Sequence, residues 1–225
     1  MNKKKLITML TALALVGAIG VGATLAYLSD KTAELTNTFK FAENGIGIEL
    51  DEATIGDDNK AVDHDNDRTP AGGGQTYDNI IPGMEMDKDP TVTITADSLN
   101  CNVFVSVKNA NAEEVLKIND FNAKAWAEVN PADYNLEAAD NTKYYVYQGE
   151  KATGTVEAND SFKVVPNAPT DTVLEDVFQT LTVGTEVTAE TEFTDIVIKA
   201  AAVQADSCAD DDAAKTALEM LLSAN

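Results

Sequence analysis

The residues of this chain that could carry out chemistry are few, and most of them are carboxylates. His64 is the single histidine, and Cys101 and Cys208 are the only cysteines. Zinc-dependent hydrolysis by an H-E-x-x-H motif needs two imidazoles and a positioned glutamate, and that motif is absent from the sequence. A serine or cysteine nucleophile would need a base, and only one histidine could serve. The sequence therefore argues against a hydrolase, and we expect a protein that is not an enzyme.

Alternating aspartates form the one pattern that is typical of a metal site. The segment DDNKAVDHDND supplies carboxylate oxygens of the kind that hard cations prefer, from Asp63, Asp65 and Asp67. An EF-hand counted from Asp63 would need glycine at its sixth position and glutamate at its twelfth, but Arg68 and Gly74 stand there. Weak calcium binding is therefore a hypothesis beside the simpler interpretation of a solvated, charged loop. His64 lies in the same loop, where we expect an exposed side chain without a ligand role.

The two cysteines are far apart in the sequence, and their spacing does not establish whether they pair. Cys101 alternates with Val103 and Val105 on one face of an expected strand, which favours a buried free thiol. Three aromatic residues are likewise interpreted as core residues rather than as a platform for a ligand: Trp126, Tyr145 and Tyr147.

The elements that would position these residues are mostly strands. Six segments alternate apolar and polar side chains as half-buried strands do: Thr91–Ala96, Cys101–Asn109, Lys143–Gly149, Ala152–Ala158, Val177–Gly184 and Thr191–Ala205. A short helix is expected over Ala110–Ile118 and a stronger one over Cys208–Leu222, where three aspartates favour the N-terminal end. The polar segment Ile55–Asn79 predicts a long, exposed, acidic loop. Together these signals predict an all-β protein, an antiparallel β-sandwich with a few short helices, one of them near the C-terminus.

The N-terminus has the order of a secretory signal peptide. Lys3, Lys4 and Lys5 form a positively charged region, and an almost uncharged apolar run follows over residues 6–21. Thr24 and Ala26 place small side chains at the −3 and −1 positions of a cut between Ala26 and Tyr27. The alternative is an uncleaved anchor, because the apolar run is near the length that spans a bilayer.

We therefore expect a signal peptide over residues 1–26 and a single domain over residues 27–225. Cleavage would remove three lysines and no acidic residue, so the formal net charge would fall from −22 to −25. A surface of that charge repels nucleic acid and anionic lipid, so neither is an expected partner, and only the signal peptide would contact a membrane. The same charge predicts that self-association responds to divalent cations and to acid.

The junction between the signal peptide and the domain resembles that of the TasA/camelysin family. In GVGATLAYLSDKTAELTNTFKFA, a Gly-rich apolar segment leads to a small-x-Ala cut, an aromatic residue, Ser-Asp and Asn-Thr-Phe, represented by Gly22, Ala23, Thr24, Ala26, Tyr27, Ser29, Asp30, Asn37, Thr38 and Phe39. The segment IIPGMEMDKDPTVTI, followed by NCNVFVSVKN, is similar to the family's Pro-Gly turn, Lys-Asp-Pro and strand pair, through Pro82, Gly83, Lys88, Asp89 and Pro90. The segment DIVIKAAAVQAD is similar to the last strand of members of this family.

This resemblance implies secretion through a dedicated signal peptidase, a jelly-roll fold and assembly into extracellular biofilm-matrix fibres, with copies of itself and related matrix proteins as partners. The freed N-terminal segment of one subunit would complete a sheet in the next by β-strand addition. The side chains available to this assembly strand are Tyr27, Leu28, Leu35, Phe39 and Phe41. Alternatively, Tyr27–Phe41 is an ordinary first strand of its own sandwich. Two other functions compete: a monomeric cell-surface or binding module of the same fold, and a camelysin-like metalloendopeptidase, which the missing zinc motif disfavours.

Overall fold

The computed structural model describes residues 29–31, 45–64, 67–70, 74–119, 121–149, 155–156, 161–206 and 209–223. Its strands, in chain order, are β1 (Ser29–Lys31), β2 (Ile48–Ala53), β3 (Arg68–Pro70), β4 (Glu85–Asp87), β5 (Thr91–Ile94), β6 (Cys101–Asn109), β7 (Leu116–Asn119), β8 (Trp126–Val129), β9 (Thr142–Tyr147), β10 (Thr155–Val156), β11 (Thr172–Val173), β12 (Thr180–Val183) and β13 (Ile196–Gln204). The helical elements are a 3-10 helix, η1 (Pro131–Tyr134), and an α-helix, α2 (Asp210–Ser223). This content confirms the expected all-β class with a helix near the C-terminus.

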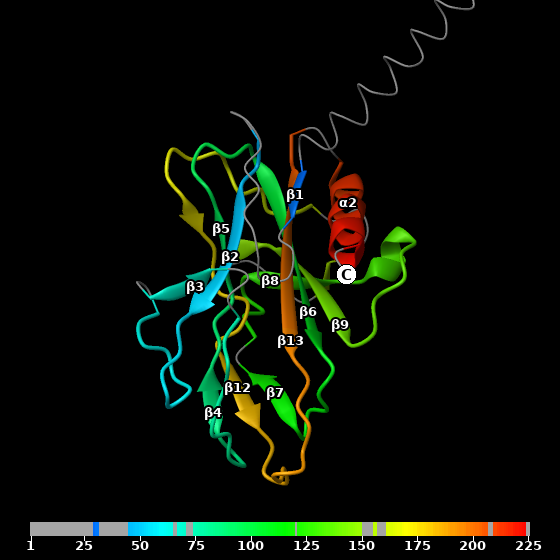
Figure 1. The fold of residues 1–225 in the computed structure, drawn as a ribbon. Helices are drawn as coiled ribbons and strands as arrows, with labels where there is room; N and C mark the ends of the chain where they lie inside the picture. The colour runs from blue at the N-terminus through cyan, green and yellow to red at the C-terminus, as the bar shows by residue number, and fades with distance from the viewer. Residues whose placement is uncertain are drawn as a thin grey trace, which may run out of the picture.

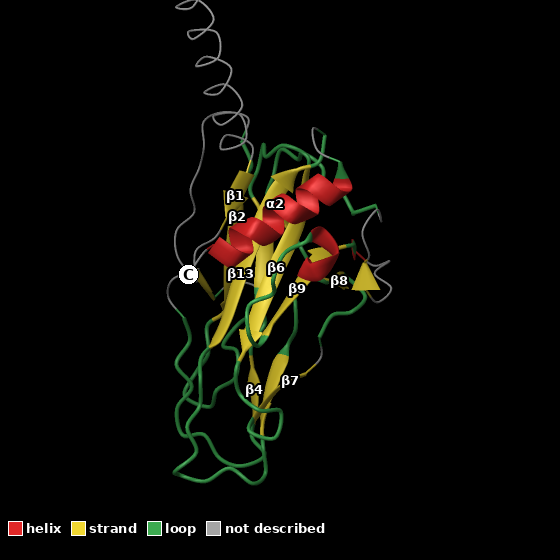
Figure 2. Cartoon of the chain, turned by 90° about the vertical axis from the view of Figure 1, so that its right-hand side faces the viewer, coloured by secondary structure: helices red, strands yellow, loops and turns green. Residues whose placement is uncertain are grey.

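The strands form three sheets. A six-stranded sheet has the order β1-β13-β6-β9-β8-β10, a four-stranded sheet the order β11-β5-β2-β3, and a three-stranded sheet the order β4-β12-β7. Among the described strands, only β10 and β8 pair in parallel. Figure 1 shows β2 and β5 on one side of the large sheet and α2 on the other. Figure 2 shows α2 lying across β13, β6 and β9. The large sheet is therefore the middle layer of the molecule.

Alternate residues of β6 belong to two different cores. Val103 and Val105 pack in the core shared with the two smaller sheets, whereas Phe104 packs in the core beneath α2. The polar residues Asn102 and Ser106 lie on the helix-covered face and are only 1% and 3% exposed. The prediction of a half-buried strand is therefore wrong for β6, because the helix covers the face that the sequence marks as polar.

Helix α2 forms close to the predicted bounds. Three aspartates occupy its first turn, where the helix dipole and the free amides favour negative charge. Its buried residues follow one stripe and include small side chains that allow a close approach to the sheet: Ala213, Ala214, Ala217, Leu218 and Leu221. In the part of the chain that the structure describes, no helix combines the length and the apolar character needed to span a membrane.

The helix expected over Ala110–Ile118 does not form. The amides of Val115 and Leu116 both donate to the carbonyl oxygen of Ala112 in a turn, and the chain then enters β7. Residues 116–119 pair with β12 from Leu116↔Val183 to Asn119↔Thr180. Pairing with a distant strand therefore overrides the weak helix propensity of this segment.

The segment Ile55–Asn79 is only partly the exposed loop that its composition predicts. It contains β3, which pairs antiparallel with the end of β2, and an isolated bridge between Ile55 and Ala61. Asn59 is buried, and its side chain exchanges hydrogen bonds with the backbone of Asp78. The loop is therefore folded onto the body of the protein, and polar contacts hold it there.

Candidate functional site

The predicted cleavage and assembly residues lie outside the described residues: Ala26, Tyr27, Leu28, Leu35, Phe39 and Phe41. The described part of this junction is β1, whose residues Ser29–Lys31 pair antiparallel with Val203–Ala201 of β13. On its other side, β13 pairs with β6 along all nine residues. A strand that follows the predicted cut thus lies at the edge of the large sheet, in a ladder of three residue pairs.

The predicted calcium ligands show no ligand cluster. Asp65 lies outside the described residues, and Asp63 and Asp67 are exposed. Across the described residues, no group of three or more His, Cys, Asp or Glu side chains is arranged to hold a metal ion. Within the described part of the chain, Asp63 and Asp67 therefore do not form a three-ligand group with another acidic, histidine or cysteine side chain.

The loop is instead tied to the sheet by a charged network. Arg68 donates from Nε to Oδ1 of Asp51 at 2.7 Å and from Nη1 to Oδ2 of Asp89 at 3.1 Å. The same oxygen of Asp89 lies 2.9 Å from Nδ1 of His64. The second oxygen, Oδ1, accepts a hydrogen bond from the backbone N–H of Ala53 at 2.7 Å. Asp89 is therefore a fully partnered carboxylate that joins the loop to the end of β2.

The surroundings of His64 in this network favour its protonated form. Its side chain is 58% exposed, and Nε2 lies 3.9 Å from Oδ2 of Asp87. The hydrogen bond to Asp89 raises the pKa of His64, burial lowers it, the charges of Asp89 and Asp87 raise it, and the charge of Arg68 lowers it, with a net increase. A raised pKa favours the imidazolium form, whereas a zinc ligand or a general base needs neutral imidazole. The expected exposure of His64 is confirmed. The sequence did not reveal its contacts with Asp89 and Asp87.

Lys88 and Glu52 form a second, buried ion pair beneath the loop. Nζ of Lys88 contacts Oε2 of Glu52, and the two side chains are 5% and 2% exposed. Nζ also lies 5.9 Å from the centroid of the Tyr77 ring, whose hydroxyl donates to the carbonyl oxygen of Asp87 at 2.9 Å. Burial, assisted by neighbouring carboxylates, raises the pKa of Tyr77 and keeps its hydroxyl neutral. Tyr77, a loop residue, thus lies close to a buried pair of charges.

Cys101 is a buried free thiol, as its alternation with valines predicts. Burial raises its pKa to about 12, so the reactive thiolate is scarce at neutral pH. Cys208 lies outside the described residues.

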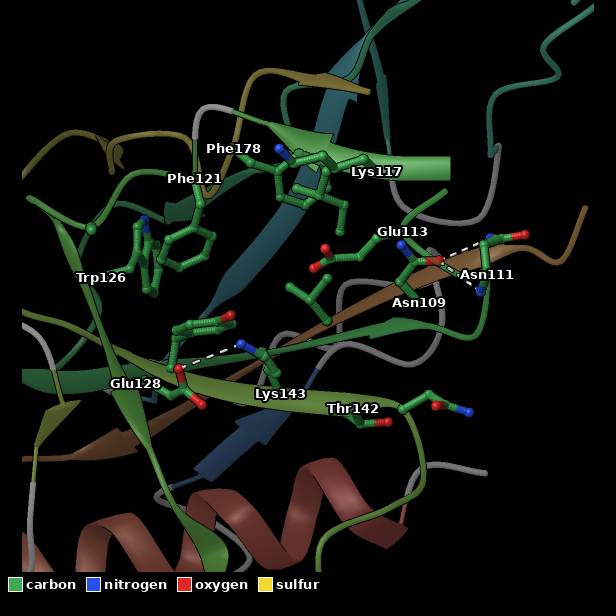
Figure 3. A pocket seen from close by; sticks show the side chains of 15 residues that line it. Asn109, Asn111, Glu113, Lys117, Phe121, Trp126, Glu128, Thr142, Lys143 and Phe178 are labelled. Carbon is green, nitrogen blue, oxygen red and sulfur yellow. Dashed lines mark hydrogen bonds and ion pairs between the residues drawn. The ribbon is translucent and has the colours of Figure 1, made fainter. Parts of the chain in front are cut away.

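A cavity of about 690 Å³ lies between β7 and the inner face of the six-stranded sheet (Figure 3). Its aromatic lining consists of Phe121, Trp126, Tyr145 and Phe178. The ring centroids of Phe121 and Tyr145 lie 4.3 Å apart, with the rings tilted by 34°. Ligand pockets in proteins are typically about 300–1,000 Å³, with a mainly apolar lining and a few polar groups. The cavity has the size and lining of a binding site.

Charged residues of both signs line the mouth of this cavity: Glu113, Lys117, Glu128 and Lys143 (Figure 3). Nζ of Lys143 lies 3.8 Å from Oε2 of Glu128, and both side chains are well exposed. Trp126 is 1% exposed and donates from Nε1 to the carbonyl oxygen of Glu175, so its interpretation as a core residue is confirmed. Tyr145 and Tyr147 also belong to the core. No local signal could have revealed the cavity, because its lining comes from separate segments between residues 107 and 178.

No family model, curated protein or solved structure matches the chain significantly. What the protein does is therefore inferred from its residues and its geometry. Three features carry that inference: the charged networks that hold the loop in place, the edge strand β1 of the large sheet, and the aromatic cavity, which has the size of a ligand pocket.

Proposed function

We propose that the chain is a secreted structural protein, a subunit of extracellular matrix fibres that assembles by exchanging its N-terminal strand between copies. The observation that carries this proposal is the position of β1. Ser29 lies three residues beyond Ala26 of the predicted cut, and β1 occupies the edge of the large sheet beside β13. An edge strand that follows a cleavage point can be supplied by another molecule as readily as by its own.

Exchange of β1 preserves the contacts that it makes within one chain. The three pairs are Ser29↔Val203, Asp30↔Ala202 and Lys31↔Ala201, and the same pairs form when β1 comes from a second copy. This equality is what makes swapping of an identical element a low-cost route to assembly. If each copy donates its strand to the next, the contact is head-to-tail, and it produces a fibre when the rotation between successive copies does not close a ring.

Much of the described structure of the subunit lies away from the ladder of β1. The nine-residue ladder between β13 and β6 remains when β1 leaves. Helix α2 also remains packed against β13 and β6 of the large sheet. We also propose a jelly-roll arrangement, because β13 pairs with β6 and β12 pairs with both β4 and β7, which are distant in sequence. The proposed partners are further copies, related matrix proteins and, during export, a signal peptidase.

We propose no catalytic role, because Asp89 binds Nδ1 of His64 and the raised pKa of His64 disfavours the neutral imidazole that a base or a zinc ligand needs. A second candidate function, a monomeric binding module of the same fold, is favoured by the aromatic cavity. Electron microscopy of the purified chain that begins at Tyr27 distinguishes the two. Strand exchange predicts fibres from this chain and none from a chain that begins at Thr32. A Tyr27 chain that stays monomeric at neutral pH, in acid and with calcium would favour the monomeric module.

A further inference from the structure

The outer edge of β7 faces the aromatic cavity, and its backbone directions can be assigned. The amide of Gly184 donates to the carbonyl oxygen of Val115 at 3.0 Å, so Val115 faces β12. In an antiparallel ladder, alternate residues direct their N–H and C=O groups to opposite sides of the strand. The backbone groups of Leu116 and Ile118 therefore point away from β12, toward the outer edge.

These two outward-facing residues differ in their partners. The N–H of Leu116 donates to Ala112 at 3.0 Å, and its carbonyl oxygen accepts from Nδ2 of Asn109 at 3.1 Å. For Ile118, the described residues supply no partner to the N–H or the C=O. An edge strand with an unused donor and acceptor is a template for an added strand.

The cavity beneath this edge provides room for the side chains of an added strand. Neighbouring strands lie about 4.8 Å apart, so a strand paired with β7 would lie over β9 and β8, whose inward-facing residues line the cavity. Val107 and Tyr145 form a buried apolar floor there, and Phe121 forms a half-buried wall. Alternate side chains of the added strand would enter the cavity, and the others would face solvent.

We infer that this cavity is a docking groove for an extended segment of a partner polypeptide, which adds to the outer edge of β7 and places alternate apolar side chains between Phe121 and Val107. The charges at the mouth balance, with two glutamates and two lysines, on a chain whose net charge is −22. A segment without net charge suits this balance. A cationic segment would instead be attracted to the acidic surface outside the groove. A saccharide would leave the backbone of Ile118 unused.

The partner segment is assigned to another protein rather than to this chain. The described part of the chain's own N-terminal segment pairs with β13, whereas the groove is lined by β7 and by residues of β6, β9 and β8, and no residue of β13 lines it. The proposed groove is therefore separate from the strand exchange proposed above, and a failure of one proposal would not disprove the other. Residues 27–41 of a second copy are the competing occupant, and the experiment includes them.

The test begins with selection of linear peptides from a displayed library against the whole mature chain. Trp126 is the single tryptophan and lines the cavity, so its fluorescence reports binding of each selected peptide. Ile118→Pro removes the outward N–H without removing a bond to β12, and proline is tolerated at a strand edge. Ile118→Val keeps that N–H, Phe121→Ala removes the wall, and Phe193→Ala is a matched control in a different cavity.

We expect selected peptides that alternate apolar and polar residues and bind at least tenfold more weakly to Ile118→Pro and Phe121→Ala, with unchanged affinity for Ile118→Val and Phe193→Ala. Circular dichroism melts show whether each variant is folded. If Ile118→Pro does not fold, the affinity of the peptides for Phe121→Ala tests the groove. Failure to enrich any peptide, or equal affinity for both groove variants, would overturn the groove. Tighter, groove-dependent binding of a peptide of residues 27–41 would overturn the assignment to another protein and identify a second copy as the occupant.

Discussion

Nδ1 of His64 lies 2.9 Å from Oδ2 of Asp89, and this oxygen also accepts a hydrogen bond from Nη1 of Arg68. Two basic side chains from the loop therefore share one oxygen of a buried carboxylate that lies two residues before the start of β5. Charge-assisted hydrogen bonds attach this part of the loop to the body. The attachment should consequently depend on pH.

We expect the contribution of His64 to folding to be lost as the pH rises. Because Asp89 raises the folded-state pKa of His64, the contribution is fully present below the ordinary value of about 6.5 and disappears above the folded value. Its magnitude is small, since the side chain is 58% exposed and screened by solvent. As the protein has one histidine, an NMR titration follows a single imidazole. The midpoint should fall in Asp89→Asn, and equal midpoints in the two proteins would contradict the assigned contact.

Removal of one member of the buried pair of Lys88 and Glu52 should destabilise the protein strongly. Glu52→Gln leaves the Lys88 ammonium buried without a counter-charge, and such a loss costs about 3–5 kcal/mol. Denaturant unfolding at neutral pH measures the change. The matched control is the double variant Glu52→Leu with Lys88→Met, which removes both charges and should recover much of the loss. A double variant as unstable as Glu52→Gln would mean that packing, not charge, dominates at this position.

Gly184 should not tolerate a side chain. A Cβ built at this position would lie 1.7 Å from the carbonyl oxygen of Glu114, so Gly184→Ala must push the β7 turn away from the end of β12. We expect a loss of about 1–3 kcal/mol, as for other overpacked positions. Gly56→Ala is the matched control, because the nearest atom to its Cβ is a side-chain oxygen of Asp58 at 3.4 Å. Thermal melts of equal midpoint for the two variants would show that the turn relaxes freely.

The long, strongly alternating elements of this fold can be read from the sequence. The bounds of β6 are identical to those predicted, and β5, β9, β12, β13 and α2 lie within or close to their predicted ranges. β5 and β12 have only four residues each, but they lie inside longer alternating segments. The other short strands cannot be read in this way, because two to four residues carry too little periodicity and owe their conformation to a distant partner. β7 is the clearest case. Its residues also suit a helix, and pairing with β12 makes the segment a strand.

The contacts of the candidate sites depend on tertiary structure in the same way. His64 and Asp89 are 25 residues apart, and Lys88 and Glu52 are 36 apart, so no spacing rule links them. The sequence could predict that the loop is acidic and that His64 is exposed. It could not predict which carboxylates the loop contacts, because that depends on where β2 ends and β5 begins.

Acid or calcium should promote assembly of the mature chain. At neutral pH and low salt the formal charge of −25 keeps copies apart, and protonation or calcium binding to surface carboxylates lowers that repulsion. Light scattering should therefore increase in calcium and return to its starting value with a chelator. Magnesium chloride at the same ionic strength separates a specific effect of calcium from screening. Scattering that is the same in calcium, in acid and in chelator would exclude charge as the control of assembly.

Removal of Tyr27–Thr36 should abolish fibres and leave a folded monomer. The deletion removes the three-pair ladder of β1, while the nine-pair ladder between β13 and β6 remains. Leu35→Pro should act similarly if Leu35 lies in the exchanged strand, because proline removes a ladder donor, and Leu35→Val is the control that keeps it. Electron microscopy measures fibres, and circular dichroism melts measure cooperative unfolding. Fibres that survive the deletion would falsify strand exchange, whereas a deletion variant without a cooperative transition would identify the segment as an integral strand of its own subunit.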